Sequence, residues 1–202
     1  MIGIIDYGVG NIKAFCNVYE RLGLPHLLVK EAHDLAKVDR IILPGVGAFD
    51  YAMEKLNASG IRGALEEHVL QNNLPVLGVC VGMQMLAESS EEGILPGLGW
   101  IKGKVKKFTD SSELLAIPHM GWNEVSLVKN NPLFKDLPRV ARFYFLHSFY
   151  FQCYEAESEI GKTNYGIEFT AILQQNKIYG IQCHPEKSHQ AGLILLRNFG
   201  EI

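Results

Sequence analysis

The sequence predicts an α/β fold in which a mostly parallel sheet is flanked by helices, with an antiparallel, β-rich portion in the second half. Two observations carry this prediction. Short apolar runs in the first half end near glycines and lead into segments with helical spacing, and continuous apolar runs are typical of strands buried on both faces. After Trp100, strand-like segments follow one another with few helices between them. The first half is therefore predicted to be doubly wound, with the second half folded onto the same core.

Three strand–turn–helix units are predicted in the first half. Their apolar strands are Ile2–Ile5, 40–43 and 74–79. The first unit continues into a helix over 12–22, where apolar residues recur every three or four positions and Asn11 is the expected N-cap. The third continues into a helix from Val81 to Ala87. Because open α/β sheets bind ligands beyond the carboxyl ends of their strands, the glycine turns that join these units mark the expected site.

The second half is predicted to contain five strands and one closing helix. The strands are expected at 101–108, 124–128, 143–146, 169–173 and 178–182, and the helix at 190–199. No repeat, linker or low-complexity tract interrupts the chain, and its 202 residues suit one α/β unit. Residues 1–202 are therefore expected to form a single domain.

Composition excludes several classes of function. Hydrophobic residues make up 48% and charged residues 20% of the chain, as in globular proteins. A net charge of −3 without a basic run argues against nucleic acid as a partner. No apolar stretch is long enough for a membrane span, and the N-terminus lacks a basic leader, so a cytoplasmic location is expected. The four cysteines form no CxxC pair, so neither a disulfide framework nor a zinc site is expected. No other metal and no cofactor is expected either.

The segment Gly78-Val79-Cys80-Val81-Gly82 has the form of a nucleophile elbow. In such an elbow the central side chain stands on a sharp strand-to-helix turn, and small flanking residues let the backbone approach closely. The following helix start favours a thiolate. The alternative is a buried structural cysteine, which is the expected state of Cys16, Cys153 and Cys183. The elbow alone leaves these two interpretations balanced.

A thiol nucleophile needs a base and a group that orients the base. Both are present in Gly180-Ile181-Gln182-Cys183-His184-Pro185-Glu186, at the end of a predicted strand. His184 and Glu186 are two residues apart across a proline, so an extended backbone projects both to one face. This pattern, at the same sheet edge as the elbow, favours a catalytic Cys80 over a packing thiol.

Further polar residues are candidates for binding. Gln84 lies one helical turn after Cys80 and is expected on the same face. The acidic run 88–93 is predicted to be a solvated helix end. It follows the Cys80 helix closely enough for one of its carboxylates to point back over the site. His119 and His147 stand in loop-like contexts where a binding role is open. The first glycine turn resembles a dinucleotide fingerprint, but Lys13 occupies the third glycine position, which argues against a Rossmann cofactor site.

The whole chain resembles a known family. The segments that carry the likeness are IIDYGVGN, LPGVGAF, GVCVGMQML, ESSEEG, GLGWIKG, IPHMGWN, FYFLHSFY, GIQCHPEKS and LLRNFG. They resemble the class I (triad) glutamine amidotransferases, which have a flavodoxin-like α/β fold, and within them the glutaminase subunits of imidazole glycerol phosphate synthase. The likeness implies hydrolysis of L-glutamine to glutamate and ammonia through a cysteine thioester. It also implies delivery of the ammonia to a separate synthase (cyclase) subunit, as a heterodimer in L-histidine biosynthesis.

The resemblance implies a role for each matched position. The catalytic residues are Cys80 as nucleophile, His184 as base and Glu186 as its orienter. The oxyanion hole includes main-chain N–H groups at Val46, Gly47 and Val81. The substrate-binding residues are Gln84, Glu92, His147 and Ser148. The residues facing the synthase partner are Asn11, Trp122 and Lys187.

Other functions stay open at this stage. Val79, Val81, Trp100 and Cys183 depart from the histidine-pathway pattern, and TNYGIEF with HPEKSH is also similar to a second branch of the family. That branch supplies ammonia for amidino groups on bacterial surface sugars. Outside the family, a cysteine peptidase-like hydrolase could use the same Cys and His, although the Gln84 and Glu92 pair argues against a peptide groove. A non-catalytic scaffold would be expected to lose at least one of the three catalytic residues.

Overall fold

Five parallel strands form one side of the sheet in a computed structural model that describes residues 1–108 and 116–202. In spatial order they are β2 (His26–Val29), β1 (Ile2–Ile5), β3 (Arg40–Gly45), β4 (Val76–Cys80) and β12 (Ile178–Ile181). Every neighbouring pair among them is parallel. The order 2-1-3-4 followed by a fifth strand is that of flavodoxin-like doubly wound folds. The α/β prediction is confirmed.

The second half of the chain extends the same sheet with antiparallel strands. Beyond β12 the order is β11 (Ile167–Gln175), β10 (Glu159–Tyr165), β7 (His119–Leu127) and β8 (Val140–His147). A branch pairs β9 (Phe149–Cys153) with β11 and with β6 (Gly103–Lys107), and β6 with β5 (Ser89–Ser90). All these strands belong to one 12-stranded sheet, so the two halves share one framework.

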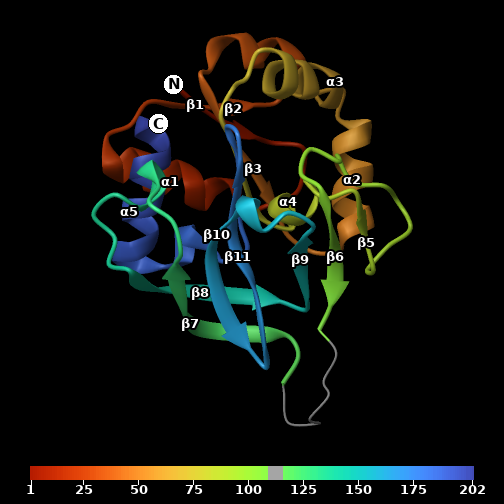
Figure 1. The fold of residues 1–202 in the computed structure, drawn as a ribbon. Helices are drawn as coiled ribbons and strands as arrows, with labels where there is room; N and C mark the ends of the chain where they lie inside the picture. Colours follow the sequence, from red (N-terminus) through yellow and green to blue (C-terminus); the bar gives the residue numbers. More distant parts are fainter. Residues whose placement is uncertain (109–115) are drawn as a thin grey trace.

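Helices cover both faces of the parallel portion. In Figure 1, α1 (Ile12–Leu22) and α5 (His189–Glu201) lie on one side, and α2 (Phe49–Ala58) and α3 (Arg62–Glu66) on the other. The Tyr19 hydroxyl of α1 donates to the Leu196 carbonyl of α5 at 3.4 Å, which ties the first helix to the last. A short helix, α4 (Val81–Gln84), follows β4. The remaining short helical segments are Ala32–Lys37, Glu67–Gln71, Pro132–Phe134, Ala156–Ser158 and Pro185–Lys187.

Burial explains why the two halves have different sequence patterns. Strands β1, β4 and β12 are buried at every position, because helices cover both of their faces, and their sequences read as unbroken apolar runs. Strand β8 instead alternates between buried and more exposed residues, since only one of its faces packs on the core. The core is continuous from β1 to the aromatic residues of β8 and β9.

Several sequence predictions of local structure are wrong. The strands β2, β5, β9 and β10 were not predicted. His119 and His147 lie in strands rather than loops, because β7 and β8 pair in register from His119 opposite His147 to Ser126 opposite Val140. The Pro, Gly and Asn residues of the β7 segment suggest a loop, and this long-range pairing overrides that local preference.

The helix after Cys80 is also shorter than predicted. It ends at Gln84 because the returning segment 98–101 donates hydrogen bonds to the carbonyls of Met85, Leu86 and Ala87. The acidic run 88–93 is consequently no helix end: Ser89–Ser90 forms β5 beside β6, and Glu92 follows in a turn.

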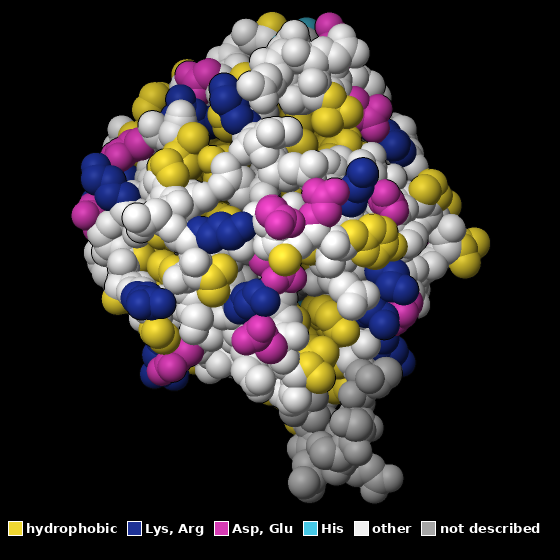
Figure 2. All heavy atoms as spheres, in the orientation of Figure 1, with side chains coloured by type: hydrophobic (Ala, Val, Ile, Leu, Met, Phe, Trp, Pro, Cys, Tyr) yellow, Lys and Arg dark blue, Asp and Glu magenta, His cyan; other side chains and the backbone are white. Residues whose placement is uncertain are grey.

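Two surface properties complete the description. On the face seen in Figure 2, acidic and basic side chains are interspersed with apolar ones, and neither charge gathers into a single patch. Among residues 1–108 and 116–202, no helix combines the length and the apolar character needed to cross a membrane.

Candidate active site

Cys80 stands on a sharp turn between β4 and α4. Its backbone has φ 55° and ψ −112°, a conformation that non-glycine residues rarely adopt and that is found at functional turns. Two glycines make the turn sterically possible. A Cβ on Gly82 would lie 2.0 Å from the Leu43 carbonyl oxygen, and a Cβ on Gly78 would lie 2.6 Å from the Gly82 oxygen. The segment therefore has the local geometry of a nucleophile elbow.

His184 and Glu186 follow the neighbouring strand β12. The His184 Nδ1 and the Glu186 Oε1 are 2.9 Å apart. The main-chain N–H of His184 donates to the Tyr144 carbonyl on β8 at 2.8 Å, so the antiparallel half of the sheet holds the loop that carries both residues. A carboxylate accepts from Nδ1–H, which leaves the other ring nitrogen, Nε2, available to Cys80.

The environment favours a charged His184. Burial opposes its charge, but the neighbouring Cys80 and Glu186 outweigh burial and raise the pKa of His184 well above its usual value. The Glu186 side chain is itself 1% exposed, so its attraction for the imidazolium is weakly screened. The site therefore holds an imidazolium at His184 between the Cys80 sulfur and one buried carboxylate.

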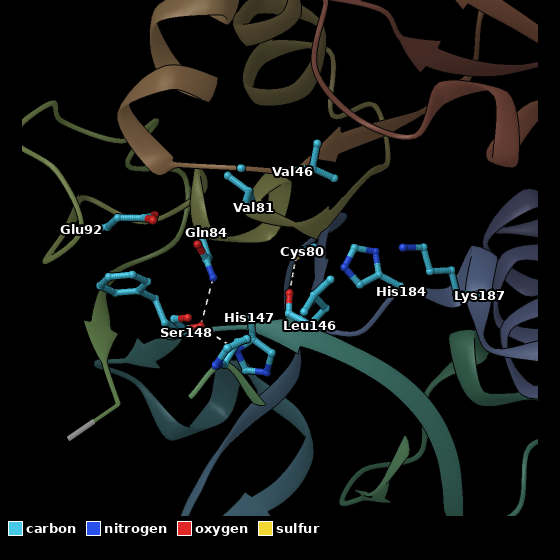
Figure 3. Close-up of a pocket in the computed structure, with 13 residues that line it drawn as sticks. Val46, Cys80, Val81, Gln84, Glu92, Leu146, His147, Ser148, His184 and Lys187 are labelled. Carbon is cyan, nitrogen blue, oxygen red and sulfur yellow. Dashed lines mark hydrogen bonds between the residues drawn. The ribbon is translucent and has the colours of Figure 1, made fainter. Parts of the chain in front are cut away.

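A cavity of about 500 Å³ opens in front of Cys80. In Figure 3, Val46 and Val81 lie on one side of it and Leu146, His147 and Ser148 on the other. Glu92 lies at one end, and His184 and Lys187 at the opposite end. The other lining residues are Gly47, Cys80, Gln84, Pro118 and Phe149. The volume suits a small molecule, and the nucleophile and the acidic end are separated along the cavity.

Gln84 is oriented by hydrogen bonds on one end of its carboxamide. Its Nε2 donates to the Phe149 carbonyl at 3.1 Å and to the Gln182 Oε1 at 3.1 Å. Both of its N–H groups are thereby used, and within the described residues its Oε1 has no donor. Figure 3 shows the Gln84 side chain in the cavity, with a dashed line from its nitrogen toward the segment at Ser148. The group left over for a ligand is therefore an acceptor, suited to an ammonium.

Glu92 lines the cavity and also accepts a hydrogen bond from the start of α2. Its Oε2 accepts from the Phe49 main-chain N–H at the start of α2, at 2.9 Å. Partial burial raises the pKa of Glu92, the bond from Phe49 lowers it, and the nearby Asp50 raises it, with a net upward shift. The helix start thus holds the carboxylate at the end of the cavity, where it supplies negative charge.

His147 belongs to a buried pair of histidines behind the cavity. Its Nε2 lies 2.9 Å from the Nδ1 of His119, and its Nδ1 lies 2.7 Å from the Phe149 carbonyl oxygen. The carbonyl is an acceptor, so His147 donates from Nδ1 and accepts from His119 at Nε2. Burial lowers the pKa of His119 to about 4 and that of His147 to about 3. Both rings are therefore neutral at pH 7, and the pair supports the carbonyl that orients Gln84.

The predicted oxyanion residues lie along the edge of the cavity. In register Gly45 is opposite Cys80, so the chain at Val46 and Gly47 passes directly beside the nucleophile. Gly47 has φ 81°, which favours glycine. Val81 is the first residue of α4, where a main-chain N–H has no partner within the helix. Main-chain donors are thus available on two neighbouring segments beside the thiol.

The predicted partner residues lie outside this cavity or at its edge. Asn11 is exposed and stands at the N-cap of α1, but its side chain makes no capping hydrogen bond. Trp122 is 41% exposed, and its ring packs edge-on against His189 with 5.0 Å between centroids. Lys187 extends over the Tyr144 ring, with 5.8 Å from its Nζ to the centroid.

An exposed apolar strip connects Trp122 with the cavity. Met120 is opposite Leu146 and Trp122 is opposite Tyr144 in the β7–β8 ladder, so these four side chains share one face. Met120 is 65% exposed and Leu146, which lines the cavity, is 38% exposed. Adjacent exposed apolar side chains of this kind mark an interaction surface.

Sequence reasoning missed several groups of the site. Gln182 contacts the nucleophile, and its position two residues before His184 is the only sequence signal for it. The carbonyls of Leu146 and Phe149 accept from Cys80 and Gln84, and a main-chain group has no sequence signature. The chemistry of the assembled site is nevertheless clear: a paired thiol, neighbouring main-chain donors and an anionic far end suit acyl transfer on an amino-acid-like substrate.

The fold and the site define a class I amidotransferase, and comparison with known proteins agrees. Residues 3–201 match the family model described as glutamine amidotransferase class-I, and the chain belongs to this family. It is 54% identical to the imidazole glycerol phosphate synthase subunit HisH of Bdellovibrio bacteriovorus and 52% identical to that of Leptospira borgpetersenii, with all of each chain covered.

A solved structure shows the same fold at low sequence identity. PurLQS from Thermotoga maritima superposes with a TM-score of 0.76 at 16% identity, covering 98% of this chain and 96% of that one. The family model and the HisH relatives show that the protein is an enzyme of the amidotransferase family, which excludes the alternative of a non-catalytic scaffold.

Proposed function

We propose that this protein is the glutaminase subunit of an imidazole glycerol phosphate synthase, hydrolysing L-glutamine for L-histidine biosynthesis. One observation carries the proposal: a single cavity is lined by Cys80 and His184 toward one end and by the acceptors Gln84 and Glu92 toward the other. Glu186 stands behind His184, with its Oε1 2.9 Å from the His184 Nδ1. Full-length identity of 52–54% to HisH subunits supports the choice of pathway.

The catalytic set performs two acyl transfers. The Cys80 thiolate attacks the side-chain amide carbon of glutamine, and the carbonyl electron pair moves onto oxygen. His184 then protonates the departing nitrogen, ammonia leaves, and a thioester remains on Cys80. Next His184 takes a proton from water, which attacks the thioester and releases glutamate and the thiolate. Glu186 holds the imidazole in one orientation and stabilises its charge.

The remaining cavity groups bind the charged parts of the substrate, which are the oxyanion formed during attack and the α-ammonium. The main-chain N–H groups of Val81 and of the Val46 and Gly47 segment donate to the oxyanion, where one such donor contributes about 10²–10³ in rate. The Gln84 Oε1 and the Glu92 carboxylate accept from the substrate α-ammonium, because both are acceptors at the far end of the cavity. His147 and Ser148 line the wall between the two ends.

The partner is a cyclase subunit that docks over the exposed apolar strip. Trp122 and Lys187 meet around the Tyr144 ring, and Asn11 begins the helix whose residues Ala14 and Asn17 line a hollow with Lys187. A heterodimer in which these three residues face the partner places the cavity beside the interface. The 1–202 chain acts as one glutaminase domain in this assembly, and its cytoplasmic location remains a prediction.

The test is glutamate release from glutamine with and without the cyclase subunit. Turnover should rise when the cyclase is added, and Cys80→Ala should abolish it. Cys153→Ala is the matched control, since that thiol lies on β9 and does not line the cavity. Full glutaminase activity in Cys80→Ala would refute the mechanism.

The same assay separates the two family branches. The synthase that forms amidino sugars is added in a parallel reaction. Stimulation by that protein and not by the cyclase would assign the subunit to surface-sugar biosynthesis instead.

A further inference from the structure

Gln182 is a buried carboxamide that contacts the nucleophile. Its side chain is completely buried, although it lies only two residues before His184. Its Nε2 is 3.7 Å from the Cys80 Sγ, and its Oε1 accepts from the Gln84 Nε2 at 3.1 Å. The main-chain N–H of Gln182 donates to the Ala171 carbonyl on β11 at 2.8 Å. The side chain is therefore anchored from both sides and stands between the nucleophile and Gln84.

One main-chain carbonyl determines the donor and the acceptor in each hydrogen bond that links Phe149, Gln84, Gln182 and Cys80. The Phe149 oxygen can only accept, so the Gln84 end that faces it is the amide nitrogen. The second N–H on that nitrogen points to Gln182, whose facing atom must be its oxygen. The nitrogen of Gln182 is consequently the end that faces sulfur. His147 also donates to the same carbonyl at 2.7 Å, which keeps that carbonyl in place.

We propose that Gln182 is a further catalytic residue, whose Nε2–H donates to the Cys80 thiolate and stabilises it for attack. The inference rests on the proposed function for its role in turnover. A thiolate is a much better acceptor than a thiol, because hydrogen bonds to ionised groups are about twice as strong as neutral ones. The Gln182 side chain is 0% exposed, so the donor itself is shielded from water and its hydrogen bond is stronger than it would be in solvent.

The arrangement also connects the two ends of the cavity. An ammonium bound at the Gln84 Oε1 polarises that carboxamide, and its N–H then donates more strongly to Gln182. The same polarisation passes through Gln182 to the N–H that faces sulfur. Occupation of the amino-acid end thus strengthens the hydrogen bond at the reacting end, through two side chains whose orientations are already set.

The decisive measurement is the rate of Cys80 alkylation by iodoacetamide as a function of pH. It is made on the full chain without glutamine or partner, and the modified peptide is quantified by mass spectrometry. Gln182→Met keeps the length and volume of the side chain and removes the donor. We expect about tenfold slower alkylation at pH 7, within the range for one hydrogen bond to a charged group, and a rate profile displaced to higher pH.

A second variant and a control make the result specific. Gln182→Glu keeps the shape and replaces the donor with an acidic group, so its alkylation at pH 7 should be slower still. Gln152→Met makes the same chemical change on β9 at an exposed position outside the cavity and should leave the profile unchanged. Thermal unfolding of each variant confirms that it is folded, and if Gln182→Met does not fold, Gln182→Glu carries the test.

The outcomes separate this inference from the proposed function. A folded Gln182 variant that alkylates with the unsubstituted profile would overturn the role of Gln182, whatever the protein hydrolyses. Absence of glutaminase activity in the unsubstituted protein would overturn the proposed function and leave the alkylation result standing. If both hold, Gln182→Met should lower kcat for glutamine by about tenfold with a smaller change in KM, since the donor acts on the thiolate.

Discussion

The buried His119–His147 pair predicts a specific loss of stability in acid. Both rings are neutral in the folded protein, because burial lowers the pKa of His119 to about 4 and that of His147 to about 3. Unfolding returns each to about 6.5. The unfolded state therefore binds more protons below pH 6.5, and the folded state is destabilised as the pH falls from there toward 3–4. Above pH 6.5 the pair adds no pH dependence.

The size of the effect follows from the pKa shifts. One pKa unit corresponds to about 1.4 kcal/mol, so each ring costs about 2 kcal/mol at pH 5, which is 1.5 units below the unfolded value. In His147→Gln this contribution of His147 is absent, while His119, His184 and the carboxylates stay in place. We expect the free energy of unfolding to fall between pH 7.5 and pH 5 by about 2 kcal/mol more in the unsubstituted protein than in His147→Gln.

Urea unfolding at a series of pH values measures this difference directly. The His147→Gln protein should be less stable at pH 7.5, because it loses bonds to His119 and Phe149, and the two stability curves should converge toward pH 5. Gln152→Met is the control, since this exposed side chain on β9 does not ionise and its replacement should leave the curve parallel to that of the unsubstituted protein. Parallel curves for His147→Gln would refute the neutral, buried state of the pair.

Two further substitutions test how the elbow is supported. Gly82→Ala places a Cβ 2.0 Å from the Leu43 carbonyl oxygen and should destabilise the protein by about 3 kcal/mol or more, with loss of Cys80 alkylation. Gly63→Ala in α3 is the control: a Cβ there meets no atom within 4 Å, so this change should be neutral or stabilising. Equal thermal midpoints for the two variants would contradict the packing at Gly82. Tyr7→Phe removes the hydroxyl that donates to the Pro44 carbonyl at 2.7 Å and should lower the free energy of unfolding by about 1 kcal/mol. Tyr51→Phe, at a side chain 48% exposed, should change it little, and urea unfolding that ranks the two in the opposite order would exclude this role for Tyr7.

The sequence alone predicted the doubly wound half because its signals are local. Strands β1, β3 and β4 are buried on both faces, so burial appears directly as an unbroken apolar run such as Ile2–Ile5. The edge strand β2 is only partly buried and was missed. Strands β9 and β10 mix buried and exposed residues without regular alternation, and the local sequence does not indicate which strands they pair with. The same contrast explains why β7 was predicted to begin at 124 although it begins at His119.

For the candidate site, the sequence by itself determined the groups whose geometry is set within a few residues. Gly78 and Gly82 define the turn at Cys80, and a two-residue spacing across Pro185 joins His184 to Glu186. Only the tertiary structure decided which groups surround them. The bond between His119 and His147 spans 28 residues and that between Gln84 and Gln182 spans 98, and such contacts exist only once the antiparallel half has closed the sheet beside β4. The physical reason is that a hydrogen bond depends on distance and direction in space, which spacing along the chain specifies only for near neighbours.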